Sequence, residues 1–158
     1  MQPGAHRDRH LWRSTQGPAR ASAGSSVIRE CLKRAGLPAD KVQALVMGNV
    51  IQAGVKMNPT RQAGISGGML IEVPALTVNR VYGSGAQAIA NAATEIEAGM
   101  IDCAIVGGME NMERSPYLLP PGRWGARMGD VTLFDSMLLD GLNAEGGAVI
   151  RSARVVRY

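Results

Sequence analysis

Apolar residues recur along this chain with two alternating periods, one helical and one typical of buried strands. The helical period first runs from Val27 to Ala35 and ends before Gly36, a residue type that favours helix C-termini. A run rich in β-branched residues follows over 41–50 and predicts an interior strand. The next predicted elements are a helix from Pro59 to about Met69 with Asn58 as its N-cap, a strand over 75–81, a helix over 84–98, a short buried strand at 103–108 and a helix over 132–142. Strands that alternate with helices predict the α/β class, with layered helices on a mixed or mostly parallel sheet.

The stretch from Leu76 to Ala93 organises this pattern, because it predicts a strand, a tight glycine turn and a helix in succession. Gly83 and Gly85 are expected to supply the turn, since glycine lets the backbone bend sharply. Free N–H groups and the dipole at the start of the helix favour an anion or a reactive group there. We therefore expect chemistry at Tyr82, and we expect the helix over 84–98 to be the most buried one.

Composition and charge limit the classes of function that this chain can have. The chain has 158 residues, 46% of them hydrophobic, which suits one globular domain without a membrane-spanning run. The net charge of +4 comes from the two ends, and no aromatic residues interleave with the basic ones, so nucleic-acid binding is not expected. We expect residues 1–26 to be an atypical, basic and disordered segment, and residues 144–158 to be an atypical tail.

The two cysteines, Cys31 and Cys103, have no metal-ligand spacing, so no metal site is expected. No secretory signal is recognisable, and a cytoplasmic location is the simplest expectation. Because the first residues contain Arg and Ser, a mitochondrial or peroxisomal location is an alternative.

Three interpretations compete for the glycine turn. Residues 83–88, GSGAQA, formally fit the G-x-G-x-x-A fingerprint of a nucleotide-binding module, which needs an acidic residue after the next strand. Asp102 lies at the wrong end of that strand, and Glu110 comes later than usual. A nucleophilic Ser84 would require G-x-S-x-G, which is absent. The remaining interpretation is a structural turn that lets a helix pack close to the sheet.

Several motifs in one order suggest a family. They are NRVYGSGAQAIANAATEIEAG (79–99), DCAIVGGMENMERSPYLLP (102–120) and RWGARMGD (123–130), with MGNVIQAG (47–54) and NPTRQA (58–63) before them. This set closely resembles the N-terminal half of thiolases, the group of acetyl-CoA acetyltransferases and 3-ketoacyl-CoA thiolases. The resemblance covers about residues 27–143 and implies a partial thiolase N-terminal domain.

The resemblance also implies a function and its residues. Thiolases are acyl-CoA C-acyltransferases of fatty acid metabolism that perform a Claisen condensation or its reverse, thiolysis, through an acyl-Cys intermediate. They need no cofactor beyond the CoA thioester, which is the substrate. The position of their nucleophilic Cys is Tyr82 here, followed by Gly83, Ser84 and Gly85 in the turn and oxyanion region. Met128 and Leu142 match residues of the substrate tunnel, and the loop over 121–128 resembles a region that helps tetramers assemble.

This chain departs from the family pattern at its centre. A tyrosine replaces the nucleophilic cysteine, and the family's C-terminal half with its acid/base residues has no counterpart in the sequence. We therefore expect a truncated or degenerate member that is inactive on its own. The alternatives are a non-catalytic partner or scaffold of an intact thiolase subunit, or a thiolase-type homo-oligomer, and a nucleotide-binding module through GSGAQA.

Overall fold

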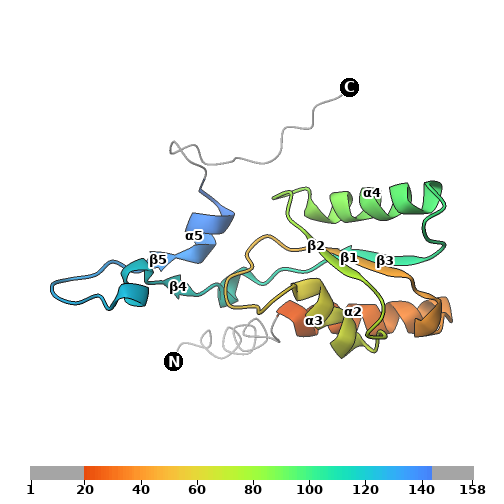
Figure 1. Ribbon diagram of the computed structural model, residues 1–158, viewed down its shortest axis with the longest axis horizontal. Helices are drawn as coiled ribbons and strands as arrows, with labels where there is room; N and C mark the ends of the chain where they lie inside the picture. Colours follow the sequence, from red (N-terminus) through yellow and green to blue (C-terminus); the bar gives the residue numbers. More distant parts are fainter. Residues whose placement is uncertain (1–19, 144–158) are drawn as a thin grey trace, which may run out of the picture.

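The computed structural model describes residues 20–143, with side chains from residue 23 onward. A three-stranded parallel sheet forms its centre, with the order β2-β1-β3 (Figure 1). The strands are β1 (Ala44–Gly48), β2 (Ala75–Val78) and β3 (Ala104–Gly108). Every residue of β1 is buried, which confirms the interior strand predicted within 41–50. The all-parallel sheet confirms the α/β class.

Helices cover both faces of this sheet. Helices α2 (Arg20–Ala35) and α3 (Pro59–Gly67) lie on one face, and α4 (Ser84–Glu97) lies on the other (Figure 1). Helix α3 connects β1 to β2, and α4 connects β2 back across the sheet to β3. These two crossovers move in opposite directions, so two connections of the same hand must lie on opposite faces. The arrangement brings the carboxyl ends of all three strands to one edge.

Helix α2 corrects the expected boundary at residue 26. It begins at Arg20 rather than Val27, and Gly24 and Ser25 are buried within it. A Cβ at Gly24 would lie 2.6 Å from the sulfur of Met109 and 3.0 Å from the Cβ of Ala63. The expectation of disorder is therefore wrong for residues 20–26, because small residues there let the helix pack closely. Residues 1–19 and 144–158, which complete the two expected atypical segments, lie outside the described part.

The expectation for α4 is also wrong within the described chain. Only Ser84, Ala88 and Ala92 of this helix are buried, whereas the shorter α3 buries Pro59, Thr60, Ala63, Gly64 and Gly67. One side of α4 packs on the sheet, and Ile89 on its other side is 58% exposed. Strand β3, expected to be buried, is an edge strand in which Ile105 is the buried residue.

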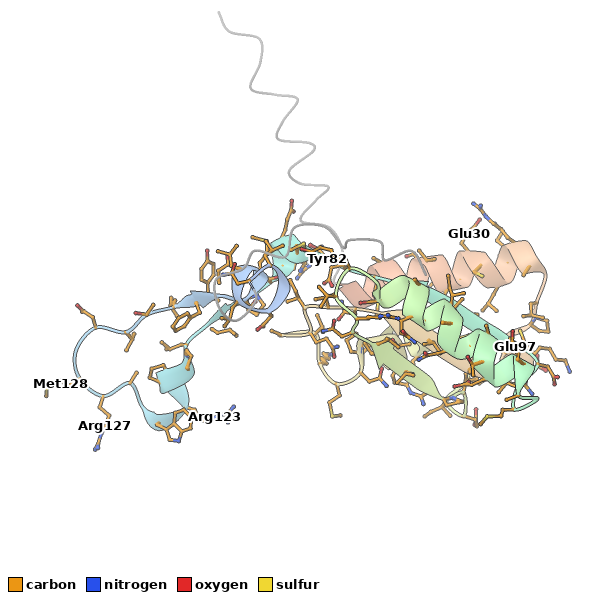
Figure 2. All side chains as sticks on the ribbon, turned by 90° about the horizontal axis from the view of Figure 1, so that it is seen from above. Glu30, Tyr82, Glu97, Arg123, Arg127 and Met128 are labelled. Atoms are coloured by element: carbon orange, nitrogen blue, oxygen red, sulfur yellow. The ribbon has the colours of Figure 1, made fainter. Side chains whose placement is uncertain are left out.

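The remaining residues form a second, elongated part. After the 3-10 helix η2 (Met112–Arg114), strands β4 (Tyr117–Leu118) and β5 (Phe134–Asp135) pair antiparallel, and they enclose η3 (Pro120–Trp124). We call residues 117–135 the arm, which extends away from the sheet (Figure 2). Helix α5 (Ser136–Gly141) begins later than the predicted 132, because Phe134 and Asp135 pair with β4 and Asp135 caps the helix.

Candidate functional site

The turn between β2 and α4 owes its shape to Val81 rather than to the glycines. Val81 has a φ of 47°, a left-handed conformation that is strained for a β-branched residue, whereas Gly83 has a φ of −105°. Neither Gly83 nor Gly85 has a positive φ, so the expectation that they supply the turn through their conformational freedom is wrong. Hydrogen bonds on both sides of Val81 stabilise this strained backbone conformation.

Ser84 and Asn79 make those hydrogen bonds. The Ser84 hydroxyl accepts from the Arg80 N–H at 3.0 Å and donates to the Val81 carbonyl at 2.7 Å. The Val81 N–H donates to the Asn79 side-chain oxygen at 3.0 Å. Ser84 is thus engaged on both sides in shaping the turn, which fits the structural interpretation of this residue rather than a nucleophilic one.

The glycine that decides the position of α4 lies on another strand. A Cβ at Gly48, the last residue of β1, would lie 2.7 Å from backbone and side-chain atoms of Ser84 and 2.8 Å from the Gly85 nitrogen. Real Cβ atoms do not approach backbone so closely. Gly48 therefore lets the start of α4 rest directly on the end of β1, next to Tyr82.

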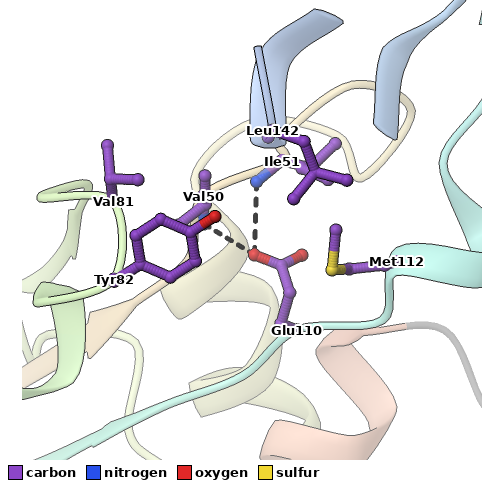
Figure 3. Close-up of a pocket in the computed structure, with 8 residues that line it drawn as sticks. Val50, Ile51, Val81, Tyr82, Glu110, Met112 and Leu142 are labelled. Carbon is purple, nitrogen blue, oxygen red and sulfur yellow. Dashed lines mark hydrogen bonds between the residues drawn. The ribbon is translucent and has the colours of Figure 1, made fainter. Parts of the chain in front are cut away.

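Tyr82 and Leu142 line one pocket, although they are far apart in sequence. This pocket has a volume of about 130 Å³ and lies at the carboxyl edge of the sheet (Figure 3). Its lining is Val50, Ile51, Val81, Tyr82, Glu110, Met112, Gly141 and Leu142. Most of these side chains are apolar. The structure therefore brings together two of the residues that the family resemblance singles out.

Met128 does not join them. Its side chain is 98% exposed at the far end of the arm, beside Arg127 (Figure 2). The resemblance places it on the same tunnel wall as Leu142, but it is not among the residues that line the pocket. Its substrate-binding role stays a prediction.

Glu110 is the pocket residue that sequence reasoning considered only for another role. Its carboxylate accepts hydrogen bonds from the Val50 N–H at 2.8 Å and the Ile51 N–H at 3.2 Å (Figure 3). It also accepts one from the Asn49 side-chain nitrogen at 3.2 Å. These bonds engage both carboxylate oxygens. Three of the acceptor positions of this carboxylate are thus used within the chain, which weakens the nucleotide-binding interpretation of GSGAQA. The signal in the sequence was its position just past a strand end.

The other candidate groups lie elsewhere. Cys31 is exposed on α2, and Cys103 is half-buried at the opposite end of β3 from the pocket. Within residues 20–143, no three His, Cys, Asp or Glu side chains gather closely enough to hold a metal ion. No helix in that range is long and apolar enough to cross a membrane.

Comparison with known proteins decides the family. A family model described as the N-terminal domain of thiolase matches residues 17–149, which is more than half of the chain. The chain belongs to the thiolase family. The match begins before residue 27, so it includes the start of α2, and the parallel sheet with its covering helices fits a thiolase N-terminal domain.

Named relatives of this family agree. The beta-ketothiolase BktB of Cupriavidus necator is 52% identical over 126 residues, which are 79% of this chain and 32% of the relative. An acetyl-CoA acetyltransferase of the same organism is 46% identical over 119 residues, 75% of this chain and 30% of the relative. An acetyl-CoA acetyltransferase of Pseudomonas aeruginosa is 44% identical over the same share of the two chains. The chain thus spans about a third of the length of the curated relatives it matches.

Proposed function

We propose that this chain carries a thiolase-type acyl-CoA site from which the covalent step is lost. The CoA thioester is the ligand, and no acyl-enzyme forms, so the chain does not catalyse condensation or thiolysis by itself. The observation that supports this proposal is the place of Tyr82, which lies at the start of α4 in an apolar pocket with Leu142. In the thiolase pattern, this is the place of the nucleophilic cysteine.

The chemistry of the two side chains differs in a decisive way. A thiolate is an effective nucleophile toward a thioester, and a helix N-terminus favours the thiolate form. A phenol is a much weaker nucleophile toward the same group, because it is scarcely ionised near neutral pH. The ring of Tyr82 also takes up room beside Val50 and Leu142, where an acyl group would enter. A thioester is thus expected to bind reversibly at most.

The pocket geometry supports the proposal from its other side. Gly48 lets the start of α4 rest on the end of β1, and we expect this helix start to supply the oxyanion donors. Within the turn itself, the Gly83 and Ser84 N–H groups donate to the Arg80 and Val81 carbonyls at 3.0 and 3.2 Å. The turn is preorganised by the hydrogen bonds that Asn79 and Ser84 accept from the Val81 and Arg80 N–H groups. In this proposal the site keeps the backbone arrangement of the turn, whereas the side chain at the nucleophile position is a phenol instead of a thiol.

A substitution at position 82 tests this proposal. We expect the full chain to thiolyse acetoacetyl-CoA at the rate of a protein-free blank, whereas Tyr82→Cys restores a reactive thiol at the helix start. Iodoacetamide should label this thiol faster than Cys31 and Cys103, and Tyr82→Ser serves as the matched control without a thiol. Thiolysis by the unmodified chain above the blank would overturn the proposal. Equal labelling of all three cysteines would show that the helix start does not activate a thiol.

A non-catalytic partner of an intact thiolase subunit is the second candidate. It is supported by the large apolar side chains that the described part exposes outside the pocket, among them Ile89 on α4 at 58% and Trp124 on the arm at 77%. Homo-oligomers of this chain would use the same surfaces. Co-purification of the tagged chain with an intact acetyl-CoA acetyltransferase would support a mixed assembly, and a single species of this chain alone would contradict it. A cytoplasmic location remains part of the proposal.

A further inference from the structure

Glu110 connects the exits of two neighbouring strands. It lies two positions after the end of β3, and its hydrogen-bond donors lie in residues 49–51, directly after the end of β1. One oxygen accepts from the Val50 N–H at 2.8 Å and the Ile51 N–H at 3.2 Å, and the other accepts from the Asn49 side chain at 3.2 Å. Bonds to a charged acceptor are stronger than neutral ones. The carboxylate thus fastens the segment after β1 to the segment after β3.

The fastened segment is itself buried at both ends. Asn49 is 1% exposed, and its side-chain nitrogen also donates to the Met109 carbonyl at 3.0 Å. Ile51 is 1% exposed as well. The Glu110 carboxylate is therefore bonded to a segment whose first and last residues are tightly enclosed.

Ile51 connects the segment held by Glu110 to helix α5. A Cβ at Gly141 would lie 2.8 Å from the Ile51 Cδ1 atom and 3.2 Å from its Cγ1 atom, so the last turn of α5 lies directly against this side chain. Leu142 follows Gly141 and forms the wall of the pocket opposite Tyr82 (Figure 3). Contacts thus run without interruption from the Glu110 carboxylate through Ile51 to Leu142.

We propose that Glu110 is a positioning residue: its carboxylate holds Val50 and Ile51 in place and thereby sets the width of the pocket between Tyr82 and Leu142. It does not need to touch a ligand to do so. The inference rests on the proposed function only in taking this pocket as the place where the acyl group enters. It explains why an acidic side chain borders a pocket whose other lining is largely apolar.

Hydrogen exchange of the full chain tests the first link. In Glu110→Ala the amides of Val50 and Ile51 should exchange about 10- to 100-fold faster, because both lose a charged acceptor. The amides of Leu45 and Met47 in β1 should keep their protection, which shows that the sheet stays folded. Glu110→Gln keeps one neutral acceptor and should give an intermediate rate. Glu113→Ala, which removes an exposed carboxylate three residues further on, is the matched control and should change neither amide.

Access to the pocket tests the second link. In the Tyr82→Cys background, adding Glu110→Ala should raise the labelling rate at residue 82 by a bulky maleimide more than by small iodoacetamide. Labelling of Cys31 and Cys103 should stay unchanged, whereas a general loosening of the fold would raise all three. No CoA thioester is used, so a failure of acyl-CoA binding would leave this result readable.

Several results would overturn the proposal. They are unchanged exchange at Val50 and Ile51 in Glu110→Ala, an equal effect of Glu113→Ala, or a widened pocket without any change in exchange. If the amides throughout β1 lose their protection from hydrogen exchange in Glu110→Ala, the same measurement on Glu110→Gln decides between the outcomes. Faster exchange at Val50 and Ile51 with Leu45 still protected supports the proposal, and exchange as in the unmodified chain overturns it.

Discussion

The two faces of the central sheet are built by different means. On the α2 and α3 face, β1 presents Leu45 and Met47, which join a core that includes Ile28, Ala63, Met69 and Met109. On the α4 face, β1 presents Val46 and Gly48, and the buried residues of the helix are Ser84, Ala88 and Ala92. The first face is stabilised by bulky side chains, and the second permits a close approach of backbones.

This difference explains where the pocket lies. Because Gly48 has no side chain, the start of α4 can rest on the end of β1, and Tyr82 reaches the carboxyl edge of the sheet beside Glu110. Four substitutions test this division.

The largest effect is expected at Leu45, on the bulky face. Leu45 is 2% exposed and packs against Gly64 of α3 so closely that a Cβ there would lie 2.6 Å from its Cδ2 atom. Leu45→Ala should lower the free energy of unfolding by about 3 kcal/mol, because it leaves a cavity in the core. Urea unfolding measures this loss. Leu45→Met should lose much less, and an equal loss would contradict the cavity argument.

On the small-residue face the damaging change is an addition. Gly48→Ala places a methyl group against the backbone of Ser84 and Gly85, which cannot swing aside. We expect a loss of about 2 to 3 kcal/mol from overpacking, measured by urea unfolding. Gly108→Ala is the matched control, since a Cβ there would meet its nearest neighbour, the Gly48 carbonyl oxygen, at 3.5 Å. Equal stability of the two variants would show that α4 is free to shift.

Asn58 anchors α3, and its loss should weaken the bulky face from its edge. Its side-chain oxygen accepts from the Arg61 N–H at 3.1 Å, its nitrogen donates to the Ala75 carbonyl at 2.8 Å, and its φ is 44°. Asn58→Ala should cost roughly 2 kcal/mol, because it removes the cap and puts alanine, which tolerates the left-handed region less well than asparagine, at this φ. Asn58→Gly should cost less in the same urea experiment. If both variants cost the same, the backbone conformation contributes nothing.

The smallest effect is expected on the outer side of α4. Ile89 is 58% exposed, so Ile89→Gln should change the free energy of unfolding by less than about 0.5 kcal/mol. The same substitution at buried Ile28 on the other face provides the contrast. A loss above about 1 kcal/mol at Ile89 would show that this side of α4 is covered in solution.

Local signals predicted much of the fold. Asn58 followed by Pro59 placed the start of α3, and the apolar run over 41–50 placed the central strand, because capping and burial are properties of short segments. The late start of α5 could not be predicted in this way. The residues before it pair with β4, a strand that lies more than a dozen residues earlier.

The candidate site shows the same division. The glycine-rich turn and the family motifs drew attention to Tyr82 and Leu142, and the structure brings the two together. The close approach at Gly48 had no local signal, since it depends on a helix packing against a strand from another part of the chain. The positive φ at Val81 was also missed, because a valine gives no sign of a left-handed conformation. Glu110 was noticed for its place after a strand, but its hydrogen-bond donors are about 60 residues away.

The sequence by itself determined the α/β class, the order of the central elements and the membership of the thiolase family. These properties are carried by periodicity, caps and motifs that are read along the chain. Only the tertiary structure decided which glycine admits α4, which face of that helix is buried, and that Met128 lies apart from the pocket at the end of the arm. The physical reason is that close approach, burial and hydrogen bonding across the sheet are properties of pairs of distant segments, which no single stretch of sequence contains.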